Sequence, residues 1–221
     1  MAGRFARVET RRRVRGFVLG LLADLPRKNC WSIAEHVGDR DPHGMQHFLA
    51  RASWDTDGVR DDLRSYVVSQ LGDPDAVLVF DETGDLKKGT CTVGVQRQYT
   101  GTAGRIENAQ VAVYLTYAAA RGHTLIDREL YLPQSWTTDS DRLAEAGVPD
   151  DIDFATKPAL AIGMLTRALR AAVPARWATG DEVYERPESA RRVRGPADRL
   201  RAGHRLRPPR PDPPARSAPT P

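Results

Sequence analysis

The fold is decided by two short stretches, AVLVFD at residues 76–81 and RWATGD at residues 176–181. Each is an apolar, strand-like run that stops at an aspartate, Asp81 in the first and Asp181 in the second. A buried strand that ends at a carboxylate carries that carboxylate to the rim of a sheet, where a hard divalent cation can bridge it to a second one. Two such strand ends, brought together by the fold, predict a metal-dependent phosphoryl-transfer site.

Composition sets the first limits. The 221 residues are 40% hydrophobic and 28% charged, which is enough for one medium domain and a smaller one. The net charge of +4 favours an acidic partner such as nucleic acid. Cys30 and Cys91 are the only cysteines, which argues against a disulfide framework and favours a reducing cytoplasm. No apolar stretch approaches the ~20 residues that cross a bilayer, so no membrane partner is expected.

Residues 1–73 are predicted to form a helical region that binds DNA. Apolar residues recur at helical spacing from Val8 to Leu22, and breaker residues separate three further helices. Ser32 is expected to cap the second helix, and Pro42 to open the third. Short helices with short links indicate a helix-turn-helix-like bundle, with a plain helical cap on the next domain as the alternative.

Residues 74–185 are predicted to form an α/β domain. Strands are expected at 76–80, 92–96, 108–117, 124–132 and 176–180, and a helix at 158–172. The first strand is expected to stop at Asp81, before a turn at 84–89. This order of elements, with acids on the first and last strands, is expected of the opening half of a ribonuclease H-like fold, here an incomplete one.

Residues 186–221 have a different composition. Ten of these 36 residues are arginine and nine are proline, while lysine, isoleucine, phenylalanine, tryptophan and tyrosine are absent. Such a segment cannot bury enough apolar surface to offset its ordering entropy, so a disordered tail is predicted. The abrupt change after Tyr184 also favours a shifted reading frame, which would make the chain a C-terminally truncated form of a longer protein.

Six motifs occur in order along the chain: VFDETG at 79–84, KKG at 87–89, VGVQRQY at 93–99, AQVAVY at 109–114, DRELYLP at 127–133 and WATGD at 177–181. Together with NCWSIAE at 29–35 and QHFL at 46–49, they resemble the insertion-sequence transposases of the DDE superfamily. Within it they are most similar to the insertion-sequence-701 type. The resemblance covers residues 5–184.

The resemblance implies DNA strand cleavage and transfer on a ribonuclease H-like scaffold, with Mg²⁺ or Mn²⁺ held by two aspartates and a glutamate. Asp81 matches the first aspartate and Asp181 the second, so both are expected to be catalytic metal ligands. The matching glutamate would lie well downstream, and no such stretch follows Asp181. The chain is therefore expected to be a transposase by ancestry that lacks the third ligand. Replacement of that ligand by Glu182 or Glu185 is the alternative, and it is not favoured.

The implied partner is DNA, at the terminal inverted repeats of an insertion sequence, in the bacterial cytoplasm and associated with the nucleoid. A homo-oligomer or a complex with intact transposase copies is also expected. DNA phosphates near the active face are predicted to be bound by Lys87, Lys88, Arg97 and Arg105, with a solvated charged loop as the alternative.

Three other acidic residues are not expected to bind the metal. Glu82 follows Asp81, and because neighbours on a strand point to opposite faces, Glu82 is expected outside the metal site. Asp127 and Glu129 are expected on a solvated strand face.

Two other functions stay open. The stretch VLVFDETG at 77–84 is similar to the nucleophile strand of a haloacid-dehalogenase-like phosphatase, in which Lys157 would bind the phosphate. That family has a second aspartate two residues after the nucleophile, where this chain has Thr83. The other alternative is a non-catalytic DNA-binding protein.

Overall fold

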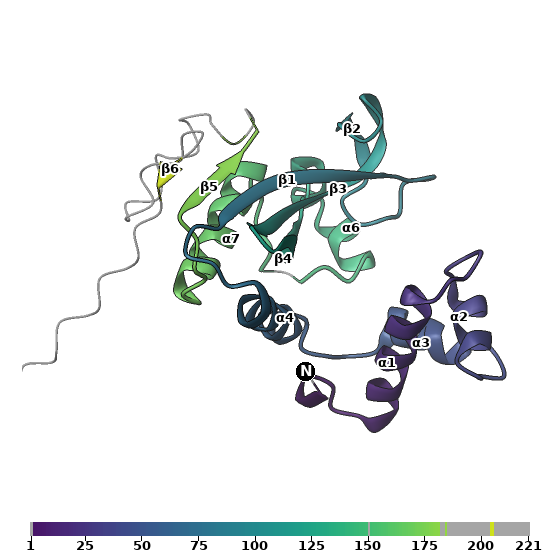
Figure 1. Ribbon diagram of the computed structural model, residues 1–221. Coiled ribbons are helices and arrows are strands. Elements are labelled where there is room, and N and C mark those ends of the chain that lie inside the picture. Colours follow the sequence, from purple (N-terminus) through teal and green to yellow (C-terminus); the bar gives the residue numbers. More distant parts are fainter. Residues whose placement is uncertain (1, 150, 182–183, 185–203, 206–221) are drawn as a thin grey trace, which may run out of the picture. The chain divides into compact units, whose positions relative to one another are not determined.

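The computed structural model describes residues 2–149, 151–181, 184 and 204–205 (Figure 1). The chain divides into two units, Met1–Ser65 and Tyr66–Pro221. Each unit has a hydrophobic core of its own. Within the described residues, no helix has the length and apolar character needed to cross a membrane.

The first unit is helical. After a 3-10 turn at Ala2–Arg4 come α1 Val8–Leu22, α2 Cys30–His36, α3 His43–Arg51 and α4 Thr56–Leu71, the last of which ends in the second unit. Ile33, Ala34 and Met45 form the buried core of α1, α2 and α3. Gly20 of α1 lets α2 approach closely, because a Cβ at this position would lie 2.7 Å from Cγ2 of Ile33.

The cap of α2 differs from the predicted one. The Asn29 side chain accepts hydrogen bonds from the backbone N–H groups of Trp31 and Ser32, at 2.9 and 3.0 Å. The hydroxyl of Ser32 accepts in return from the backbone N–H of Asn29 at 3.2 Å, which completes a capping box. The prediction that Ser32 caps this helix was wrong, because asparagine caps as well as serine does and stands three residues earlier.

The second unit is built on a six-stranded sheet. The strands are β1 Val77–Leu86, β2 Gln96–Thr100, β3 Arg105–Ala119, β4 Gly122–Leu130, β5 Trp177–Gly180 and β6 His204–Arg205. β3 is antiparallel to β1 on one side, and to β2 and then β4 on the other. β5 follows the helix α7 (Lys157–Arg170) and pairs with β1 in parallel. The mixed α/β fold predicted from the sequence is confirmed.

β1 does not stop at Asp81, as the sequence predicts, but continues to Leu86 and stays paired with β3 throughout. Gly84, expected in a turn, is a strand residue opposite Val111. A Cβ at Gly84 would lie 2.6 Å from Cβ of Thr100, so the glycine makes room for a side chain of β2. A glycine is typical both of a turn and of a close approach within a sheet, which explains the error.

The main core lies on the face of the sheet that α7 covers. Its buried members on the strands and α7 include Leu78, Phe80, Val113, Leu115, Tyr117, Ala161, Met164, Leu165 and Ala168. Because side chains alternate along β1, Glu82 follows Leu78 and Phe80 on the α7 face, whereas Asp81 lies on the opposite face. This alternation decides the surroundings of each acidic residue.

Tyr117 joins three parts of the second unit. Its fully buried hydroxyl accepts the backbone N–H of Asp73, just after α4, at 2.8 Å. The same hydroxyl lies 3.1 Å from the carbonyl oxygen of Asp73 and 2.8 Å from that of Pro174, and donates to one of them at a time. Burial raises the pKa of this phenol, so it stays a donor. Tyr117 therefore holds the segment that leads into β5 against the middle of the sheet.

Replacing Tyr117 by phenylalanine is expected to lower the free energy of unfolding by about 1–3 kcal/mol, because the N–H of Asp73 loses its acceptor. Urea unfolding measures the loss. The control is Tyr99→Phe, which removes the hydroxyl of a tyrosine that is 60% exposed and should change stability by less than about 0.5 kcal/mol. Equal losses in the two variants would contradict the anchoring role.

Two short helices between β4 and α7 were not predicted, α5 Gln134–Thr137 and α6 Ser140–Glu145. They hold Trp136, which is 1% exposed and donates its indole N–H to the carbonyl of Val95 at 2.9 Å. Helices this short carry no periodic apolar pattern that a sequence could reveal.

The predicted disordered tail, 186–221, lies almost entirely outside the described residues. The exception is His204–Arg205, which the prediction did not foresee as a strand and which pairs antiparallel with Ala178 and Trp177 of β5.

Candidate metal and DNA site

β1 and β5 bring Asp81 and Asp181 to equivalent positions on two neighbouring strands. The two strands are parallel, and their last paired residues are Phe80 and Gly180. An aspartate follows on each strand, and both aspartates are exposed although Phe80 is buried. Parallel pairing therefore places two aspartates that lie far apart in the sequence on neighbouring strands.

Glu82 lies on the other face of β1, in a half-buried polar cluster. Its Oε1 is 2.6 Å from Nζ of Lys157, at the start of α7. Its Oε2 accepts the hydroxyl of Tyr184 at 3.1 Å. The Glu82 and Lys157 side chains are only 15% and 18% exposed, so solvent screens this ion pair weakly.

The pKa of Tyr184 is raised by burial and by three carboxylates. Burial raises the pKa of its phenol well above the ordinary value, and the charges of Glu82, Asp181 and Asp81 raise it further. The tyrosine is therefore a permanent hydrogen-bond donor.

The donor set suits a hard divalent cation. Mg²⁺ is commonly held by one or two carboxylates, with water and substrate phosphates as its other ligands. Asp81 and Asp181 supply two such carboxylates. In the part of the chain that the structure describes, no group of three or more His, Cys, Asp or Glu side chains is arranged to hold a metal. Glu182 and Glu185, the replacements considered for a third ligand, lie outside that part.

The four predicted phosphate-binding residues all lie at the β2 end of the sheet, but not on one face. Lys87 lies 3.9 Å from the carboxylate of Asp85, and Arg105 lies 2.7 Å from that of Glu107. Arg97 stands opposite Asn108 and shares the face of Asp81, whereas Arg105 points to the other face. Among the described residues, Lys88 and Arg97 have no acidic partner.

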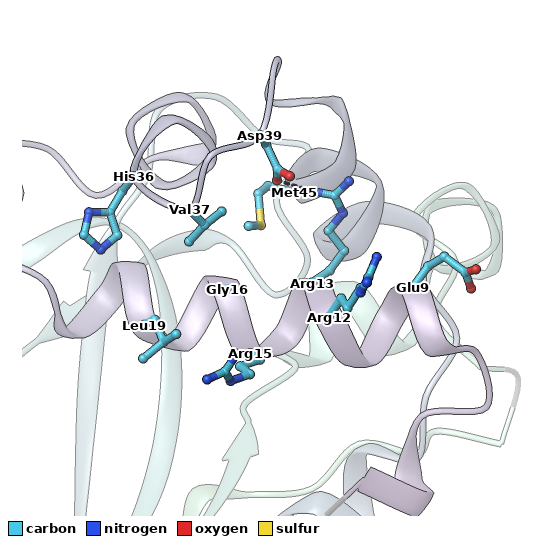
Figure 2. A pocket seen from close by; sticks show the side chains of 10 residues that line it. All are labelled: Glu9, Arg12, Arg13, Arg15, Gly16, Leu19, His36, Val37, Asp39 and Met45. Carbon is cyan, nitrogen blue, oxygen red and sulfur yellow. Dashed lines mark hydrogen bonds and ion pairs between the residues drawn. The ribbon is translucent and has the colours of Figure 1, made fainter.

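A second basic surface lies in the first unit (Figure 2). A hollow of about 480 Å³ is bordered by α1, α2 and α3 and lined by Glu9, Arg12, Arg13, Arg15, Gly16, Leu19, His36, Val37, Asp39 and Met45. Arg13 reaches from α1 and forms an ion pair with Asp39. Arg12 and Arg15, one turn apart on α1, are exposed and have no acidic partner in the described part of the unit.

Comparison with known proteins identifies the family. A model of the family described as DDE superfamily endonuclease matches residues 1–221. The chain belongs to the DDE superfamily endonucleases. The resemblance seen in the sequence is thereby confirmed.

This DDE superfamily chain is also similar to one curated protein from Microchaete diplosiphon, a probable transposase for insertion sequence element IS701. The two are 39% identical over 95 residues, which cover 43% of this chain and 25% of the relative. The match thus spans about a quarter of the relative's length. No solved structure matches the chain.

The topology of the DDE superfamily chain argues against the phosphatase alternative. After Asp81 the chain continues as a strand and pairs antiparallel with β3, where the phosphatase would have a helix. Lys157, proposed there as a phosphate ligand, is paired with Glu82.

Asp127 and Glu129 do not lie on a solvated face, contrary to the prediction. A β-bulge between Leu115 and Thr116 places Asp127 opposite Leu115, on the α7 side of the sheet. The Asp127 side chain is 1% exposed and accepts two hydrogen bonds from Arg167 of α7, at 2.9 and 3.2 Å. Arg167 also lies 2.6 Å from Glu129. The bulge inserts one residue, which reverses the alternation that the prediction assumed.

Sequence reasoning missed the roles of Lys157 and Tyr184 in this DDE superfamily endonuclease. Both are far from Glu82 in the sequence and meet it only through the fold. The one local signal was the position of Tyr184, three residues after Asp181, where its backbone N–H donates to the Asp181 carbonyl at 3.0 Å.

Proposed function

We propose that this protein is an insertion-sequence transposase that cleaves and transfers DNA strands. The observation that carries the proposal is the parallel register of β1 and β5, which aligns Asp81 with Asp181. The strand order β4-β3-β1-β5, with α7 before β5, supports the opening half of a ribonuclease H-like fold. The relative's name, a probable transposase, supports the same reading.

Asp81 and Asp181 would hold Mg²⁺ or Mn²⁺, which when bound activates the attacking oxygen and stabilises the leaving oxygen in phosphoryl transfer. Asp81 and Asp181 are both exposed residues, as ligands of a cation that also binds a DNA backbone would be. Arg97, on the same face as Asp81, and Lys88 would bind neighbouring phosphates. Lys157 forms an ion pair with Glu82 and is therefore not assigned to phosphate binding.

The first unit would bind DNA through a helix-turn-helix-like arrangement of α2 and α3. His43, Gln46 and His47 are exposed at the start of α3, at a spacing that places them on one face. A helix with exposed polar residues in its first turns suits the reading of base edges in the major groove. Arg12 and Arg15 of α1 would bind the adjacent phosphates.

Replacing Arg12 and Arg15 together by alanine is expected to weaken DNA binding at all sequences. The slope of log affinity against log salt concentration should become shallower by about 2, because each lost phosphate contact contributes roughly 0.9. Fluorescence anisotropy with a labelled duplex at several salt concentrations measures the slope. Arg121→Ala, at an exposed arginine between β3 and β4, is the control and should leave the slope unchanged.

A non-catalytic DNA-binding protein is the second candidate. The specific observation in its favour is that no third acidic side chain joins Asp81 and Asp181 within the described ranges. Two carboxylates can hold a cation without providing the full ligand set that the superfamily resemblance implies.

One experiment separates the two candidates. The full chain is incubated with Mn²⁺ and a duplex that carries the terminal repeat of its insertion sequence, and both binding and strand cleavage are recorded. Cleavage that depends on Mn²⁺ and Asp81 would establish the transposase. Repeat-specific binding without cleavage would establish the binding protein, and the absence of both would contradict each proposal.

A further inference from the structure

Contacts with β1 hold the chain before and after Asp181. Before it, β5 pairs with β1 up to Gly180. After it, the Tyr184 hydroxyl donates to Glu82 of β1 at 3.1 Å. Asp181 lies between these two attachments, on a turn that the backbone bond from Tyr184 N–H to the Asp181 carbonyl closes at 3.0 Å.

The aromatic ring of Tyr184 is also fixed, by packing against β1 and β5. Tyr184 is 8% exposed, and its ring centroid lies 6.3 Å from that of Phe80. A Cβ at Gly180 would lie 3.0 Å from Cδ2 of the Tyr184 ring, so the ring rests directly on the backbone at the end of β5. A glycine just before Asp181 thus allows the tyrosine to fold back over the strand.

Glu82 is itself fixed from a third element. Lys157 at the start of α7 lies 2.6 Å from Oε1 of Glu82, which leaves Oε2 for Tyr184. The Lys157 ammonium also lies 5.6 Å from the centroid of the Tyr131 ring, within the range of a cation–π contact. The glutamate is therefore presented to Tyr184 in one orientation.

We propose that Glu82, Lys157 and Tyr184 are positioning residues that hold the carboxylate of Asp181 beside that of Asp81. The proposal rests on the function proposed above, in which the two aspartates bind a divalent cation. Glu82 acts through Tyr184 and the turn and does not touch the metal, because it points to the α7 face while Asp81 points to the other. Groups that orient metal ligands typically contribute about 10- to 100-fold to metal affinity.

The test is a Mn²⁺ titration of the full chain in which electron paramagnetic resonance measures the free Mn²⁺. It is carried out well below the melting temperature of each variant. Tyr184→Phe keeps the ring and removes the hydroxyl, and is expected to weaken Mn²⁺ binding about 10-fold. Tyr99→Phe is the matched control and should bind like the wild type. Glu82→Gln should weaken binding much less than Asp81→Asn, and equal losses in these two variants would make Glu82 a ligand and overturn the proposal.

Hydrogen exchange gives a reading that does not depend on metal. The backbone amide of residue 184 should exchange about 10-fold faster in Tyr184→Phe than in the wild type, because the turn loses its attachment. Unchanged exchange, or faster exchange with unchanged Mn²⁺ affinity, would overturn the positioning role. If the wild type shows no Mn²⁺ binding that depends on Asp81, the proposed metal site fails, and exchange at residue 184 alone decides whether the turn is held.

Discussion

Replacing Asp81 by asparagine is expected to lower the Mn²⁺ affinity of the protein by about 100-fold or more, since even groups that only orient a ligand contribute about 10- to 100-fold. Asparagine keeps the size of the side chain and one acceptor oxygen but removes the charge that a hard cation requires. Any cleavage of DNA that depends on Mn²⁺ should be lost with it. Asp181→Asn should have the same effect, because both aspartates would hold one cation.

DNA affinity measured without metal should not fall in Asp81→Asn, because a carboxylate does not attract phosphates. The matched control is Asp85→Asn, an exposed aspartate two strand positions beyond Thr83 on the same face of β1. It should keep the Mn²⁺ affinity of the wild type. An equal loss in Asp85→Asn would mean that Mn²⁺ responds to the general charge of the strand, and a large loss of DNA affinity in Asp81→Asn would argue against a metal ligand.

Replacing Arg167 by methionine is expected to lower the free energy of unfolding by about 3 kcal/mol. Asp127 is 1% exposed and loses two hydrogen bonds together with the positive charge of the guanidinium, and removing one partner of a buried ion pair is strongly destabilising. Burial disfavours the charged Arg167, but hydrogen bonds and charges from Asp127 and Glu129 outweigh it and raise the pKa of the guanidinium. The arginine therefore stays charged in the folded protein at all ordinary pH values.

Chemical denaturation at neutral pH measures this loss of stability, and two further variants serve as controls. Arg176→Ala removes the partner of Asp75 from an ion pair whose side chains are 41% and 69% exposed, and should cost less than about 1 kcal/mol. The double variant Arg167→Met with Asp127→Leu should recover most of the stability, because both buried charges are then removed together. A single variant as stable as the wild type would show that Asp127 is not buried as a charge.

Much of the fold follows from local patterns in the sequence. Apolar runs and breakers located most helices and strands, and the order of elements predicted the mixed α/β architecture. Errors occurred where one residue serves two purposes. Gly84 indicated a turn but makes room for Thr100, and Ser32 indicated a cap although it only completes the cap that Asn29 provides.

Asp81 and Asp181 could be singled out from the sequence alone, because a carboxylate at the end of an apolar run is a local feature. Membership of the DDE superfamily could likewise be inferred from motifs that occur in order along the chain. The tertiary structure decided which residues surround the two aspartates. Parallel pairing of β1 with β5 aligns them, and a bulge in β4 turns Asp127 inward to Arg167. Strand register and bulges depend on pairing between distant segments, whose energies no local pattern of residues records.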